Sequence, residues 1–246
     1  MRALTMPVLR AGRMRAGACV LARRYAVASS FLAGYLAVTV AGSRLSPPVR
    51  SALAAWASTS VANLEHHPAG SLAASAFIAE GSAYAWPALI ALAVFGANRG
   101  LGNARTAVVC AAGHVIGTLV SEGIVAYRVD RGALPVSYRH ILDIGPSYVV
   151  VSAIVVALAS GSWPARAAAG LDLAVLVFAG RIFSGLSHLD VAAVGHLTAL
   201  GVAALGMMLI RARQGRRVKR GPGCGGPEAR GGAGQDATAP MRAPTP

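Results

Sequence analysis

The stretch that decides the fold class is Val191-Ala-Ala-Val-Gly-His-Leu-Thr-Ala-Leu-Gly-Val-Ala-Ala-Leu-Gly-Met-Met-Leu-Ile210, which runs directly into Arg211-Ala-Arg-Gln-Gly-Arg-Arg-Val-Lys-Arg220. The first part is long enough for a helix across a hydrocarbon core about 30 Å thick, at about 1.5 Å per residue. The second part holds six basic residues and no acidic residue. Basic residues beside a span favour the cytoplasmic side, so this segment predicts a membrane helix that ends in the cytoplasm.

The composition of the whole chain supports a membrane protein. Of its 246 residues 55% are hydrophobic and only 13% are charged, and the net charge is +14. A soluble domain would carry about 25% charged residues. The basic residues concentrate in the two tails instead of on a polar face with aromatic residues, so nucleic acid is not an expected partner. Three cysteines without CxxC spacing predict neither a disulfide nor a metal site, and no cofactor is expected.

Five more apolar runs precede this span, which makes six predicted transmembrane helices in an all-α bundle. The second run is the least regular, because Pro87 lies inside it and Glu80 just before it. The first run follows a basic lead of 24 residues, which is long for a cleaved signal peptide, and we therefore expect a retained helix. Residues 43–81 are too polar to span and predict a long first loop with partly embedded helical pieces. The five runs are residues 25–42, 84–97, 106–126, 144–160 and 167–183.

Both ends of the predicted bundle are basic, so both termini are expected in the cytoplasm, which requires an even number of spans. We expect a multi-pass protein of the plasma membrane whose basic flanks bind the anionic inner leaflet. Residues 1–24 then form a basic cytoplasmic tail and residues 25–210 the membrane domain. Residues 211–246 form a cytoplasmic tail that is basic up to residue 220 and then rich in Gly and Pro, and this last stretch is predicted to be disordered.

Ionisable side chains inside a span are costly, so each one is a candidate for function. In the predicted topology the fourth and sixth spans both enter from the outside, which places Ser147 about 6 Å deep and His196 about 9 Å deep. A histidine base can activate a serine hydroxyl as a nucleophile. Gly145 and Pro146 before the serine can expose N–H groups to a developing oxyanion. The ionisable candidates are His114, Glu122, Asp172, Arg181 and His196.

Four segments in this order resemble the rhomboid family of six-helix intramembrane serine proteases. They are Leu72-Ala-Ala-Ser-Ala-Phe77, Ala93-Val-Phe-Gly-Ala-Asn-Arg-Gly-Leu-Gly102, Asp143-Ile-Gly-Pro-Ser-Tyr148 and Val194-Gly-His-Leu-Thr-Ala199. The resemblance implies a rhomboid-like bundle with Ser147 as nucleophile and His196 as base. It also implies substrates that are transmembrane proteins, cleaved near their outer end.

Two departures from the family pattern leave other functions open. Tyr148 stands where the family has a glycine, and residues 84–89 lack the His-x-x-x-Asn pair that helps to bind the oxyanion. Glu80, Glu122 and His114 are possible polar accessory groups, although the anions would repel an oxyanion. A catalytically weak or inactive relative that binds transmembrane clients is the main alternative. A small transporter that uses the intramembrane charged residues is a further one.

Overall fold

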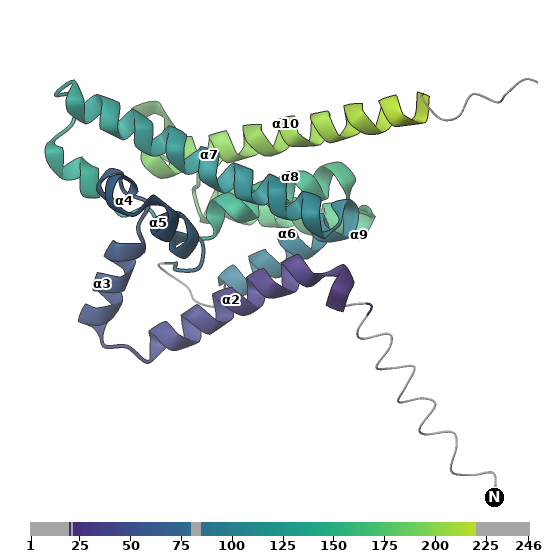
Figure 1. Cartoon of the computed structure of the whole chain (residues 1–246), viewed down its shortest axis with the longest axis horizontal. Helices are drawn as coiled ribbons and strands as arrows, with labels where there is room; N and C mark the ends of the chain where they lie inside the picture. The colour runs from purple at the N-terminus through teal and green to yellow at the C-terminus, as the bar shows by residue number, and fades with distance from the viewer. Residues whose placement is uncertain (1–19, 21, 80–84, 220–246) are drawn as a thin grey trace, which may run out of the picture. The chain divides into compact units, whose positions relative to one another are not determined.

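The computed structural model describes residues 20, 22–79 and 85–219 (Figure 1). These residues form helices and connecting loops without a strand, as the predicted all-α class requires. The elements in chain order are α2 (Ala26–Ser43), α3 (Pro47–Ala57), α4 (Val61–His66), α5 (Pro68–Ser75), α6 (Ala85–Leu101), α7 (Asn103–Asp130), the 3-10 helix η1 (Val136–His140), α8 (Ser147–Ser160), α9 (Trp163–Ala174), the π-helix η2 (Val175–Ala179), the 3-10 helix η3 (Leu186–His188) and α10 (Val191–Lys219).

Three of the described helices are long and apolar enough to cross a membrane: Ala26–Ser43, Asn103–Asp130 and the segment Val191–Arg216 of α10. Two further apolar helices, α6 and α8, are shorter. The 14 residues of α8 rise only about 21 Å, less than the thickness of a hydrocarbon core. The described part of the chain is therefore all-helical and has the long apolar helices of a membrane protein, and the count of six spans remains a prediction.

Helix α8 is the centre of the unit that ends at Leu209. It packs against α6, α7 and α9, and nine of its 14 residues are buried. Its sequence is apolar on every side, which is typical of a helix enclosed by other helices. Glycines allow two neighbours to approach it closely, because a Cβ at Gly113 of α7 would overlap Ser152 and a Cβ at Gly195 of α10 would overlap Tyr148.

The predicted first loop contains three short helices, α3, α4 and α5, as the expected helical pieces. The side chain of Asn63, which belongs to α4, caps the C-terminal end of α3: its amide donates to the carbonyls of Ala55 (2.7 Å) and Ser58 (2.8 Å). The His67 ring stacks on Trp56 and hydrogen-bonds to the Trp56 carbonyl at 2.9 Å. These polar residues of the loop therefore stabilise its own fold.

The fifth predicted span differs most from its expected form. Residues 167–183 were expected as one helix, but α9 ends at Ala174 and the π-helix Val175–Ala179 follows it. Arg181 then adopts a left-handed φ of +50°, which stops the helical path. The chain is thus redirected just before Ile182, whose carbonyl faces the candidate site.

The sixth predicted span begins at Val191 as expected, and α10 runs on to Lys219. Residues 210–219 are the described part of a second unit, and these residues are helical. The predicted basic N-terminal tail and the Gly/Pro-rich C-terminal tail lie outside the described residues, apart from residues 20 and 22–24.

Candidate functional site

Ser147 is the first residue of α8 and is half-buried. The predicted span begins at residue 144, but Gly145 has a φ of +136°, which is not helical, so α8 starts only after Pro146, its N-cap. The Gly145 amide donates to the Ser75 carbonyl at 2.9 Å, which fixes this turn to the end of α5. The first N–H groups of a helix have no partner within that helix. The amides of Ser147 and Tyr148, at the first turn of α8, therefore have no acceptor within the helix.

His196 lies on the second turn of α10 and is 5% exposed. Its Nδ1 is 3.1 Å from the Ile182 carbonyl, and the Ala192 carbonyl also lies near the ring. A carbonyl only accepts, so in the neutral ring Nδ1 carries the proton and Nε2 keeps a free lone pair. Nε2 is buried and has no hydrogen-bond partner in the described part of the chain. The ring thus has the tautomer that a general base requires.

Ser147 and His196 are both described, and no hydrogen bond joins them in this structure. The catalytic dyad therefore remains a prediction. Hydrogen bonds between catalytic groups are often long or absent without substrate and form only in the complex.

The Tyr148 side chain lies in the interior and is 3% exposed. Its ring meets the His196 ring edge-on, with the centroids 4.9 Å apart, and lies 6.1 Å from the His114 ring. The hydroxyl donates to the Asp143 carboxylate at 3.3 Å and is 3.4 Å from the Val191 carbonyl. The bulky residue after the serine is thus part of the packing around the histidine.

Asp143 connects this tyrosine to the first loop. The Thr59 hydroxyl donates to the Asp143 carboxylate at 3.1 Å, and the Thr59 amide donates to the Asp143 carbonyl at 2.9 Å. The Asp143 amide in turn donates to the Ser58 hydroxyl at 2.9 Å. Burial raises the pKa of the Asp143 carboxyl above its usual range, while the bonds from Thr59 and Tyr148 oppose that rise.

The two described accessory candidates, Glu122 and His114, both lie on α7. His114 Nε2 is 2.9 Å from the Leu72 carbonyl, so this side chain joins α7 to α5. Glu122 is 2% exposed and lies near the Val61 amide, yet neither carboxylate oxygen has a hydrogen bond within the described residues. It is also within electrostatic range of Asp143 and Tyr148. Glu80 lies outside the described residues.

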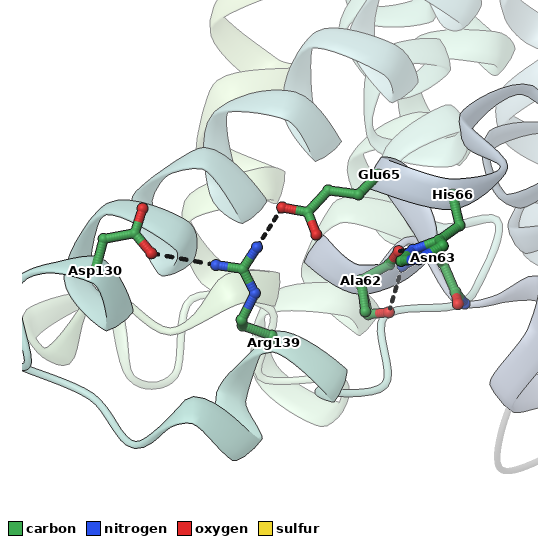
Figure 2. Close-up of polar contacts among 7 residues, drawn as sticks. Ala62, Asn63, Glu65, His66, Asp130 and Arg139 are labelled. Carbon is green, nitrogen blue, oxygen red and sulfur yellow. Dashed lines mark hydrogen bonds and ion pairs between the residues drawn. The ribbon is translucent and has the colours of Figure 1, made fainter.

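A salt-bridge cluster fixes the loop between α7 and α8, which leads toward Asp143. Arg139 of η1 contacts Glu65 of α4 and lies 3.2 Å from Asp130 at the end of α7 (Figure 2). The hydrogen bond and charge of Glu65 raise the pKa of Arg139 further. The loop after α7 is thereby joined to the first loop on its exposed side.

The two remaining ionisable candidates, Asp172 and Arg181, do not pair with each other. Asp172 is buried and its Oδ2 has no partner, whereas Arg181 is exposed, and the two form no ion pair in the described structure. Within the same residues, no three His, Cys, Asp or Glu side chains gather in a way that could hold a metal ion.

Sequence reasoning proposed Ser147 and His196 as site residues but did not point to two of the groups around them. The Ile182 carbonyl is a backbone atom, and no sequence pattern marks it. Thr59 lies in a polar stretch of the first loop, far from Asp143 along the chain. Asp143 stood in the segment that carries the resemblance, but its contacts depend on the folded loop.

The helical membrane unit, with a serine at a helix start and a buried histidine on a later span, defines the class as a polytopic membrane protein with a candidate Ser/His site. A family model described as "Rhomboid-like protein" matches residues 23–216. The chain therefore belongs to the rhomboid-like family. No curated protein and no solved structure matches it.

Proposed function

We propose that this protein is an intramembrane serine protease that cleaves transmembrane proteins near their outer end. The observation that carries the proposal is the state of His196: Nδ1 is hydrogen-bonded to the Ile182 carbonyl, and Nε2 is buried without a partner among the described residues. Membership of the rhomboid-like family supports the same assignment.

In the proposed reaction His196 Nε2 takes the proton of the Ser147 hydroxyl while the serine oxygen attacks the substrate carbonyl. The protonated ring then donates to the leaving amine, and water hydrolyses the acyl-enzyme with His196 again as base. The amides of Ser147 and Tyr148 are the proposed oxyanion donors, in place of the His and Asn of the family pattern. Substrate binding has to bring the serine oxygen to about 3 Å from Nε2.

The proposed setting is a six-span protein of the plasma membrane with both termini in the cytoplasm. The basic residues that follow Ile210 support this orientation, because basic flanks stay on the cytoplasmic side. Ser147 and His196, each near the start of its helix, then lie toward the outer face. The proposed partners are transmembrane substrates and the anionic lipids of the inner leaflet.

A fluorophosphonate probe tests the proposal, because it reacts only with an activated serine. The purified wild type is expected to be labelled, while Ser147→Ala and His196→Ala are not. Ser152→Ala is the matched control: Ser152 lies on the same helix, but its hydroxyl donates to the Tyr148 carbonyl at 2.8 Å. Equal labelling of the wild type and Ser147→Ala would refute the protease.

A second candidate function is the binding of transmembrane clients without cleavage. The missing Ser147–His196 hydrogen bond favours it, as does the absence of a His-x-x-x-Asn pair in residues 85–89. Loss of one oxyanion donor typically costs about 10² to 10³ in rate. A client that co-purifies equally with wild type, Ser147→Ala and His196→Ala, without being cleaved, would support this function.

A further inference from the structure

The loop before α8 is held by the first loop through a compact set of hydrogen bonds. Ser58 and Thr59 contact residues 141–143 through both backbone and hydroxyl groups. The Thr59 hydroxyl reaches two acceptors of Asp143, its carbonyl at 3.0 Å and its carboxylate at 3.1 Å. We call this set of hydrogen bonds between residues 58–59 and residues 141–143 the first-loop contact. It fixes where the Asp143 carboxylate lies.

The first-loop contact continues into the site through Tyr148. The Asp143 carboxylate accepts from the Tyr148 hydroxyl, and the Tyr148 ring meets the His196 ring edge-on. Glycines flank the tyrosine on both sides: a Cβ at Gly195 would overlap the ring, and a Cβ at Gly117 would lie 3.6 Å from Tyr148 Cδ2. Close packing thus fixes the plane of the ring. The hydrogen bonds of the Tyr148 hydroxyl to Asp143 and to the Val191 carbonyl fix the position of the ring along its long axis.

We propose that Thr59 and Asp143 are positioning residues: Thr59 holds the Asp143 carboxylate, this carboxylate holds the Tyr148 hydroxyl, and the Tyr148 ring in turn sets the position of the His196 imidazole. The inference rests on the proposed function, since it gives the first loop a part in orienting the base. Among the described residues, the titratable groups that face Tyr148 are His114 and Glu122 from α7, Asp143 from the preceding loop and His196 from α10.

Nuclear magnetic resonance of the histidine rings in the full-length protein tests the proposal without relying on protease activity. A proton near an aromatic ring has a shifted resonance that changes when the ring moves. The His196 signal, assigned with His196→Gln, is expected to move in Thr59→Val and in Tyr148→Phe by more than the other histidine signals. Thr59→Ser, which keeps the hydroxyl, is expected to restore the wild-type position.

Thr39→Val is the matched control, because Thr39 lies close to a tyrosine of α2, Tyr35, outside the site. It is expected to leave the His196 signal in place. An unmoved signal in both Thr59→Val and Tyr148→Phe would overturn the proposal. A shift in Tyr148→Phe alone would overturn the role of the first loop. If Thr59→Val does not fold, Tyr148→Phe and Asp143→Ala decide: an unmoved His196 signal in either variant overturns the proposal.

Fluorophosphonate labelling separates this proposal from the protease itself. A moved His196 signal in a protein that never labels supports the positioning role and refutes the protease. An active wild type with slower labelling in Thr59→Val, restored in Thr59→Ser, supports both.

Discussion

Gly195 allows α10 to approach the Tyr148 ring, and an alanine there is expected to destabilise the protein. A Cβ at this position would overlap the hydroxyl and the ring carbon Cζ and lie 2.7 Å from Cε1. The ring cannot move aside freely, because the Gly117 side of α7 packs against it. Overpacking of a buried core typically costs about 1–3 kcal/mol. His196 is the next residue, so the same change is expected to abolish fluorophosphonate labelling.

Gly201→Ala is the matched control on the same helix. A Cβ at Gly201 meets nothing within 4 Å, so this variant gains helix propensity, worth about 1 kcal/mol, without a clash. Both variants share the gain in helix propensity, so the difference between their free energies of unfolding measures the cost of overpacking at Gly195. We expect Gly195→Ala to be less stable than Gly201→Ala by about 1–3 kcal/mol.

Unfolding in mixed micelles of increasing denaturing-detergent content, followed by circular dichroism, measures this difference. Adding Tyr148→Phe to Gly195→Ala is expected to recover part of the loss, because it removes the hydroxyl that the new Cβ would overlap. Equal stability of the two alanine variants would refute the close packing of Tyr148 against α10.

Two further predictions concern the loops. The pKa of Asp143 is raised above its ordinary value of 3.8, so the folded state favours the protonated acid and stability falls as pH rises from 3.8 through the raised value. Asn at position 143 cannot ionise, so the stability of Asp143→Asn is expected to rise relative to that of the wild type as pH rises through that range. A stability difference between the two proteins that stays constant from pH 4 upward would contradict this. Asn63→Ala removes the bonds that end α3 and is expected to cost about 1 kcal/mol in the same unfolding assay, because a hydrogen bond contributes about 0.5–1.5 kcal/mol. Asn98→Ala, which removes one bond to the Arg24 carbonyl, serves as comparison, and a smaller loss in Asn63→Ala than in Asn98→Ala would argue against the Asn63 cap.

Apolar length and charge position predicted the long helices well. The run at residues 25–42 is the helix Ala26–Ser43, and the span expected from residue 191 begins at Val191. These boundaries follow from local chemistry, because an apolar run ends where charged residues begin. The start of α8 was placed three residues early, since hydropathy does not register that Gly145 and Pro146 bend the chain before a helix.

The fifth span shows where periodicity fails. Its hydropathy continues to residue 183, but the helix changes to a π-helix at Val175 and turns at Arg181. An apolar sequence does not distinguish these backbone paths. The turn places the Ile182 carbonyl beside His196.

The sequence by itself determined that this chain is an all-helical membrane protein of the rhomboid-like family, and it singled out Ser147 and His196. Composition, charge and short motifs are enough for that, because they depend on residues close together along the chain. Tertiary structure decided that Ile182 holds the histidine, that Tyr148 packs against it, and that Thr59 reaches Asp143 across 84 positions of the chain. Such contacts depend on how helices pack, and a linear pattern of residue types does not contain that information.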